Sequence, residues 1–255
     1  MPDQPPPVPV DRLRFEMPPV HDEPDRERAH RKERLAGALR LLARLGFEED
    51  PAALATARDP EHPDCLWVNP FGRAATALTA GDLLLVDADG RVLEGGRRVN
   101  GLSFALHAAV HRARPDAVAV VRAHGPYGRA LAALGQLIAP LTQEACAFYQ
   151  DHALVDEYTR GAADPAECAR IARALGPYKA LVLRNHGVLT VGATVDAAAW
   201  WTVAAERAAR VQLTARAAGR PAPIGHRSAL AARERFGTDL AAWAAYQPLR
   251  ESAAP

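Results

Sequence analysis

Hydrophobic residues recur along the chain at two kinds of spacing, which separate predicted helices from predicted strands. Leu35, Leu39 and Leu42 lie at helical intervals in an otherwise charged segment, so they predict a first amphipathic helix. Near-continuous apolar runs at 118–121 and 180–183 are bounded by turn residues. Runs of this length predict strands that are buried on both faces of a sheet.

The same patterns assign most of the remaining chain. Strands interleave with helices over a single stretch, which predicts one α/β domain with its sheet in the middle. Further strands are predicted at 66–70, 83–87, 91–94 and 188–191, and further helices at 101–113, 127–134, 165–175 and 196–216, with a short helix that carries Glu144 and Phe148 and a last helix that carries Trp243 and Tyr246.

The ends of the chain differ from its middle. The first 24 residues contain eight of the 21 prolines, and proline disfavours both helix interiors and central strands. We therefore predict an extended N-terminal arm at residues 1–24 and an α/β domain at 25–218. Residues 219–255 form a predicted C-terminal extension with one helix.

Charge and composition exclude several classes of protein. Lys and Arg number 31 against 30 Asp and Glu, so the chain lacks the basic excess that drives nucleic-acid binding. Apolar runs are far shorter than the roughly 20 residues that cross a bilayer, and no export signal is visible at the N-terminus. The three cysteines form no CxxC pair, which favours reduced thiols. We expect a cytoplasmic protein that binds neither nucleic acid nor membrane and acts on a small molecule.

Two predicted strands end in a histidine beside a glycine. One ends in Arg122-Ala123-His124-Gly125, and the other runs into Asn185-His186-Gly187. Such strand ends often carry active sites, because the sheet fixes the residues while the loops shape a pocket. Side chains alternate along a strand, so residues 122 and 124 point the same way. Each histidine could also have a purely structural role.

A second histidine pair lies inside a predicted helix. His107 and His111 are four residues apart, so they share one helix face and could mimic a pair of metal ligands. That helix is expected to pack on the sheet. We therefore expect a structural role for both.

Several motifs together resemble the class II aldolase/adducin family. They are Arg114-Pro115-Asp116, His124 followed by Gly-Pro-Tyr-Gly, Gln143-Glu144-Ala145, and the run at 183–192 that contains Asn-His-Gly. The resemblance covers roughly residues 30–218 and implies a three-layer α/β/α sandwich with a central mixed sheet. It also implies a homotetramer with active sites between neighbouring subunits. Catalytic members of the family hold a divalent metal, commonly zinc, through two histidines of an H-x-H strand and a third from the Asn-His-Gly turn.

When the family's metal ligands are matched to positions of this sequence, only part of the metal site is retained. His124 and His186 match two of the metal ligands, but the first histidine of H-x-H is replaced by Arg122, which cannot bind a metal cation. The carboxylate of the sugar-phosphate aldolases aligns near Ser103. Their phosphate-binding turn aligns with residues 53–58, which lack glycine. A sugar phosphate is therefore not the expected substrate.

Two explanations of these departures stay open. The pocket could have decayed into a silent adducin-like scaffold, or it could have been adapted to another substrate. In the second case Arg122 binds a carboxylate or enolate oxygen through paired hydrogen bonds, with Asn185 and Ser103 as further substrate-binding residues. Glu144 is then the candidate general acid or base, and Tyr149 a candidate for proton transfer. Zinc or iron could remain on His124 and His186, or the enzyme could be metal-free.

The sequence thus favours a specialised lyase for a hydroxy- or keto-carboxylate. The expected reaction is carbon–carbon cleavage or formation, or decarboxylation, through an enolate. The alternatives are a non-haem iron oxygenase or decarboxylase of a secondary-metabolite pathway and the silent scaffold. Replacing Arg122 by histidine would restore the metal triad, so that variant is predicted to gain metal affinity.

Overall fold

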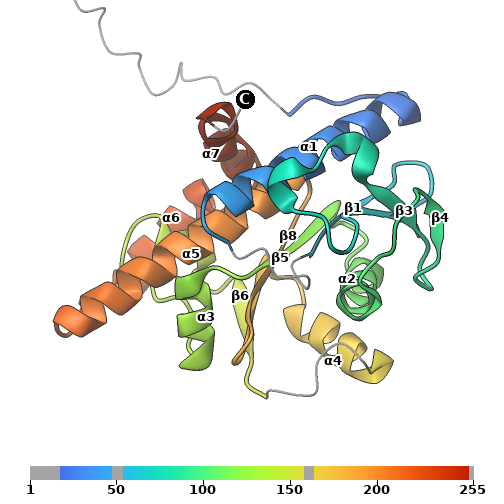
Figure 1. The fold of residues 1–255 in the computed structure, drawn as a ribbon. Helices are drawn as coiled ribbons and strands as arrows, with labels where there is room; N and C mark the ends of the chain where they lie inside the picture. The colour runs from blue at the N-terminus through green and yellow to red at the C-terminus, as the bar shows by residue number, and fades with distance from the viewer. Residues whose placement is uncertain (1–17, 48–53, 158–163, 253–255) are drawn as a thin grey trace, which may run out of the picture.

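The computed structural model describes residues 18–47, 54–157 and 164–252. Within these ranges helices and strands alternate along the chain (Figure 1). In chain order the elements are α1 (Pro24–Arg44), β1 (Leu54–Arg58), β2 (Leu66–Val68), the 3-10 helices η2 (Ala75–Ala77) and η3 (Ala80–Asp82), β3 (Leu84–Val86), β4 (Val92–Glu94), α2 (Gly101–Ala113), β5 (Ala119–Ala123), α3 (Pro126–Ala133), the 3-10 helix η4 (Ala145–Phe148), β6 (His152–Val155), α4 (Pro165–Leu175), β7 (Ala180–Leu183), β8 (Gly187–Gly192), α5 (Val195–Ala218), α6 (His226–Phe236) and α7 (Asp239–Ser252).

The strands form one mixed sheet. Among the described residues, eight strands lie in the order β4-β3-β2-β1-β5-β8-β7-β6. Strands β6 and β7 are parallel, whereas every other neighbouring pair is antiparallel. The mixed sheet confirms the fold class predicted from the sequence.

Each face of the sheet is covered by its own set of helices. On β5, Ala119, Val121 and Ala123 pack in a core shared with α1 and α5, whereas Val120 packs in the core of α2 and α4. Arg122 falls on the face of Val120 because side chains alternate along a strand. Figure 1 shows α1 and α5 on one side of the sheet and α2 and α4 on the other. The expected three-layer α/β/α arrangement is therefore present.

Strand β1 corrects one expectation. Residues 53–58 align with a phosphate-binding turn in the sequence comparison, but Leu54–Arg58 form a strand between β2 and β5. The guanidinium of Arg58 donates hydrogen bonds of 2.7 and 3.1 Å to the carbonyl oxygens of His111 and Arg114. These bonds fasten the end of β1 to the end of α2.

The C-terminal extension differs from the single helix that the sequence predicts. It contains α6 and α7, and the break between them begins at Gly237. Buried Lys179, directly before β7, donates hydrogen bonds of 2.9 and 2.6 Å to the carbonyl oxygens of Ala147 and Gly237. Its ammonium also lies 2.8 Å from the Asp151 carboxylate. One buried cation therefore ties the extension to the sheet and to η4.

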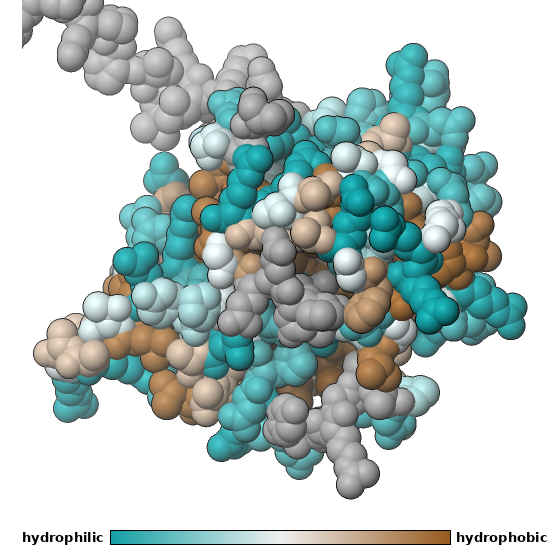
Figure 2. Space-filling model, viewed as in Figure 1, coloured by the Kyte–Doolittle hydropathy of each residue, from teal (hydrophilic) through white to brown (hydrophobic). Residues whose placement is uncertain are grey.

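The face of the molecule drawn in Figure 2 is largely polar. Figure 2 shows mostly hydrophilic residues on this face, with hydrophobic residues along α5 and at the edge strand β4, where Leu93 is exposed. None of the described helices combines the length and apolar character needed to cross a membrane. Most of the predicted N-terminal arm lies outside the described residues, and the predicted domain boundaries stay predictions.

Candidate active site

Two neighbouring strands bring the predicted histidines together. Strand β5 pairs with β8 in an antiparallel register that sets Ala123 opposite Val188. His124 follows β5 and His186 precedes β8, so this register places both residues at the same edge of the sheet. Their ring centroids lie 5.0 Å apart. The proximity of the two strand ends predicted from the sequence is therefore present in the fold.

The turn before β8 allows this close approach. Asn185 has a positive φ of 57°, a left-handed conformation that asparagine tolerates better than most residues. A Cβ atom on Gly187 would lie 3.1 Å from Cδ2 of His124. The glycine therefore leaves room for the His124 ring beside the backbone of β8.

Arg122 joins the two histidines in a buried cluster. Only 4% of Arg122 is exposed. Its Nη2 donates a 2.7 Å hydrogen bond to Oγ of Ser103, and its Nη1 lies 3.3 Å from Nε2 of His186. Since a guanidinium only donates hydrogen bonds, His186 accepts through an unprotonated Nε2 and carries its proton on Nδ1. The structure thus groups Ser103, Arg122, His124 and His186.

This cluster does not fit the family's metal in its present form. Two imidazoles that share a tetrahedral metal at about 2.0 Å have ring centres about 5 Å apart, which is the spacing of His124 and His186. However, the Nε2 lone pair that would bind the metal faces the Arg122 guanidinium. In the described part of the chain, no three His, Cys, Asp or Glu side chains are grouped to hold a metal. His124 and His186 therefore have no third His, Cys, Asp or Glu ligand beside them among the described residues.

The predicted proton-transfer residues lie apart from the cluster. Glu144 is exposed at the start of η4, where its backbone carbonyl accepts a hydrogen bond from Ala147 N–H and its side chain does not cap the helix. The hydroxyl of Tyr149 lies 3.0 Å from Nδ1 of His226 on α6. Within this chain neither residue contacts Arg122, and their catalytic roles stay predictions.

Glu206 on α5 supports the cluster, although the sequence analysis does not single it out. Its carboxylate accepts hydrogen bonds of 2.8 and 2.7 Å from the backbone N–H groups of Tyr127 and Gly128. These bonds cap α3, which begins two residues after His124. Burial raises the pKa of Glu206, while the two backbone bonds act to lower it. The available sequence signal was an acidic residue in the middle of an alanine-rich helix.

A second buried set of polar residues, separate from the Arg122 cluster, lies between α2 and β1. The Thr56 hydroxyl lies 3.0 Å from Nδ1 of His107 and 2.9 Å from Nε2 of His111. Burial lowers the pKa of His111 to about 3 and that of His107 well below its usual value. Both rings are therefore neutral. The four-residue spacing of His107 and His111 indicated from the sequence that the two rings lie together. Nothing in the sequence indicated that Thr56 contacts them.

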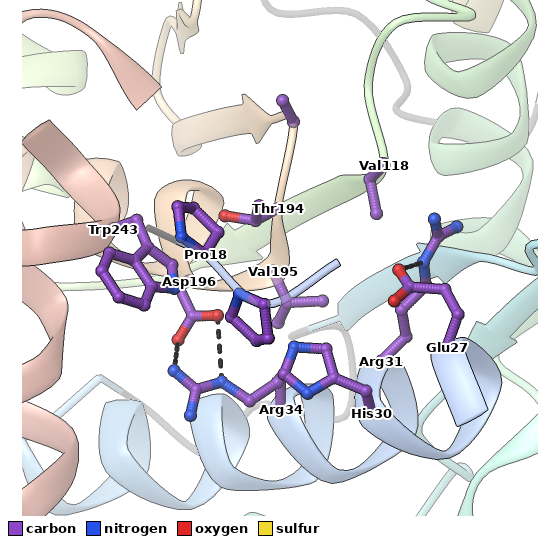
Figure 3. Close-up of a pocket in the computed structure, with 12 residues that line it drawn as sticks. Pro18, Glu27, His30, Arg31, Arg34, Val118, Thr194, Val195, Asp196 and Trp243 are labelled. Carbon is purple, nitrogen blue, oxygen red and sulfur yellow. Dashed lines mark hydrogen bonds and ion pairs between the residues drawn. The ribbon is translucent and has the colours of Figure 1, made fainter. Parts of the chain in front are cut away.

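A hollow elsewhere in the molecule contains none of the predicted site residues. It lies near the N-terminus of α5, at the opposite end of β8 from His186 (Figure 3). Arg34 Nε donates a 2.9 Å hydrogen bond to Asp196 there, and Arg31 pairs with Glu27. The charges are matched within the hollow, which indicates a structural role.

Comparisons with known proteins identify relatives over most of the chain. The family model "Class II Aldolase and Adducin N-terminal domain" matches residues 33–213. "Decarboxylase NovR" of Streptomyces niveus is 45% identical over 241 residues, which cover 94% of this chain and 89% of that protein. "4-hydroxy-3-prenylphenylpyruvate oxygenase/4-hydroxy-3-prenylbenzoate synthase" of Streptomyces roseochromogenus subsp. oscitans is 45% identical over 240 residues, covering 93% and 87%. The structure titled "L-fuculose 1-phosphate aldolase from Glaciozyma antarctica PI12" matches with a TM-score of 0.86 at 40% identity, over 92% of this chain and 93% of that one.

Proposed function

Since the chain belongs to the class II aldolase and adducin family, we propose that it is a lyase for a hydroxy- or keto-carboxylate. The reaction makes or breaks a carbon–carbon bond through an enolate. The observation that carries this proposal is the buried guanidinium of Arg122, held between Ser103 and His186 beside His124. A fixed cation in a buried cluster stabilises negative charge that develops on a substrate oxygen.

The chemistry of the cluster divides the roles among its members. Arg122 binds the carboxylate or the keto oxygen through paired hydrogen bonds and stabilises the enolate when the adjacent carbon–carbon bond breaks. His186 is engaged by Arg122 through Nε2, so it orients the guanidinium. His124 takes the proton from a β-hydroxyl group in a retro-aldol cleavage, or returns one to the enolate after loss of CO₂. Asn185 is exposed at the adjacent turn and contacts the substrate from there.

Several features favour a carboxylate over a sugar phosphate. One solved relative is titled a sugar-phosphate aldolase, but two curated relatives are named a decarboxylase and an arylpyruvate oxygenase/benzoate synthase. The sequence directly before β1 contains Glu48, Glu49 and Asp50 and no glycine. A phosphate-binding turn depends on glycine, so the lack of glycine in this segment of the sequence disfavours a phosphate group. An aromatic keto-carboxylate is therefore the first substrate class to test.

We further propose a homotetramer in which the sites lie between subunits. Arg122 contacts Ser103 and His186, and the Tyr149 hydroxyl contacts His226, so proton transfer by Glu144 or Tyr149 would be completed by a neighbouring subunit. Sedimentation equilibrium of the purified protein tests the assembly.

The reaction is tested with a panel of keto-carboxylates. Phenylpyruvate, a 3-keto-3-phenylpropanoate and a 4-hydroxy-2-keto-4-phenylbutanoate distinguish oxygenase, decarboxylase and aldolase reactions by their products. The panel is run with a chelator, and again with added iron(II) and oxygen. Release of CO₂ from the 3-keto acid, or of pyruvate and aldehyde from the hydroxy-keto acid, is expected with the chelator present and lost in Arg122→Gln.

The other outcomes favour other functions. Turnover of phenylpyruvate only with iron(II) and oxygen would favour the oxygenase alternative, which the name of one 45% identical relative supports. Absence of both turnover and calorimetric binding across the panel would favour a silent scaffold. Either result would overturn the lyase proposal.

A further inference from the structure

The Gly-Pro-Tyr-Gly segment that follows His124 contains two glycines whose backbone conformation does not require them. Gly125 has φ −78° and ψ 147°, a conformation that any residue adopts, and Gly128 lies within α3. Both glycines instead lie against the carboxylate of Glu206. A Cβ atom on Gly125 would lie 2.9 Å from Oε1 of Glu206 and closer still to the other carboxylate atoms, and one on Gly128 would lie 3.1 Å from Oε2. The two glycines therefore leave room for this carboxylate.

The Glu206 carboxylate replaces a cap that the sequence of α3 does not supply. The first N–H groups of a helix have no partner within it, and Gly125, the N-cap residue, has no side chain to accept from them. Glu206 accepts from the N–H groups of Tyr127 and Gly128 at 2.8 and 2.7 Å. Two charge-assisted hydrogen bonds to successive amides fix both the position and the direction of the first turn.

Helix α3 connects the two histidine segments of the cluster. Its N-cap, Gly125, directly follows His124. Near its other end, the carbonyl oxygen of Ala132 accepts a 3.2 Å hydrogen bond from the N–H group of Asn185, the residue before His186. Figure 1 shows α3 beside α5. A displaced first turn of α3 would therefore move the backbone of His124 relative to His186, whose ring centroid lies 5.0 Å from that of His124.

We propose that Glu206 is a positioning residue for His124. Its carboxylate fixes the first turn of α3, and that turn fixes the direction in which the His124 ring enters the cluster. The effect on catalysis rests on the proposed function, in which His124 transfers a proton. The position of the ring does not depend on that function.

A double-mutant cycle tests whether Glu206 is the reason for the glycine at position 125. Gly125→Ala should lower Tm in the wild type, because the added methyl group displaces the carboxylate from its two amides. In Glu206→Ala the same space is empty, and only the cost of alanine at an N-cap remains. We expect the decrease in Tm to be at least about twofold larger in the wild type than in Glu206→Ala. Equal decreases would overturn the proposal.

A spectroscopic measurement reports the position of the His124 ring directly. A Cβ atom on Gly187 would lie 3.1 Å from Cδ2 of His124, so an Hα atom of this glycine points at the ring and should give a nuclear Overhauser effect to its Hδ2. Glu206→Gln keeps the size of the side chain but only one acceptor oxygen, and its amide group faces the second backbone N–H. In the ligand-free full chain, this variant should weaken the Overhauser effect.

Asp239→Asn is the matched control for Glu206→Gln. The half-buried Asp239 carboxylate also accepts two hydrogen bonds from other segments, from Ala193 N–H at 2.6 Å and from Trp201 Nε1–H at 3.0 Å. Ala193 follows the end of β8 that is remote from the cluster, so this variant tests the loss of an equivalent pair of bonds elsewhere. It should retain the wild-type Overhauser effect. Equal Overhauser effects in the two variants would overturn the positioning role.

Catalysis separates this inference from the proposed function. With a keto-carboxylate that the wild type turns over, Glu206→Gln should lower kcat about tenfold, because a misplaced acid or base loses much of its effect. Its affinity for oxalate, a planar mimic of a keto-acid enolate, should stay within about twofold of the wild type, since Arg122 binds that anion. An unchanged kcat, or an equal loss of oxalate affinity, would contradict the positioning role. If the wild type turns over no member of the panel, the lyase proposal loses its support, while the cycle and the Overhauser effect still decide the role of Glu206.

Discussion

Replacing Arg122 by histidine is expected to create a tight metal site. The change removes the guanidinium from the Nε2 atom of His186 and places a third imidazole on β5, which ends directly before His124. The rings of His124 and His186 already lie 5.0 Å apart, so two ligands need little movement. The fold therefore contributes most of the geometry, and the substitution supplies the missing ligand.

The expected increase in zinc affinity follows from the number of metal ligands. Structural zinc sites with four ligands bind with about 10–16 kcal/mol, so one ligand contributes about 3 kcal/mol, or about a hundredfold in Kd. Arg122→Gln removes the positive charge without adding a ligand and is the matched control. We expect Arg122→His to bind zinc at least about a hundredfold more tightly than Arg122→Gln.

Competition with a chromophoric chelator measures these affinities, and the visible spectrum of bound cobalt(II) reports tetrahedral geometry. Adding His186→Ala to Arg122→His should abolish the gain. Equal zinc affinity of Arg122→His and Arg122→Gln would refute the placement of residue 122 in the metal position. A gain that survives His186→Ala would place the metal elsewhere.

Three further predictions concern stability. Lys179→Met should lower the free energy of unfolding in urea by about 3 kcal/mol, because it leaves the Asp151 carboxylate and two carbonyl oxygens without their buried cation. Lys32→Met removes an ion pair of 3.5 Å and a contact with the Trp67 ring, and should cost only about 1 kcal/mol. Gly187→Ala should lower Tm more than Gly219→Ala. Both glycines have a similar φ, but only a Cβ atom on residue 187 would contact His124. An equal decrease in Tm for the two variants would show that backbone strain alone matters. Burial raises the pKa of Asp59, but hydrogen bonds from Arg28, Trp67 and backbone N–H groups outweigh it and hold the pKa well below its usual value. Its contribution to stability is therefore full above about pH 4 and falls with further acidification. Asp59→Asn should flatten the dependence of the unfolding free energy on pH between about pH 4 and 2, and an unchanged slope would contradict this.

The sequence predicted the elements whose patterns are strong and local. Continuous apolar runs located β5 and β7, and the family resemblance assigned His124 and His186 to one site. Strand β1 was missed because Ala55 and Ala57 are weak strand formers. They are small because they pack in the core shared with α1, a requirement that only the assembled layers reveal.

The contacts of the site were harder to predict than its residues. Arg122 and Ser103 were both expected to contact substrate, but their hydrogen bond depends on how closely α2 lies against β5. The link from His107 to Thr56 likewise joins residues 51 positions apart. Such contacts are set by packing between elements, which periodicity does not encode.

The register of β5 and β8 also protects the chain from misalignment. Side chains alternate along each strand, so a slip of one residue would turn Arg122 and His124 toward α1 and α5. That face accommodates small residues such as Ala119 and Ala123, and burying a guanidinium there without partners would cost several kcal/mol. Burial of Arg122 and His124 on the wrong face therefore disfavours a sheet in a slipped register.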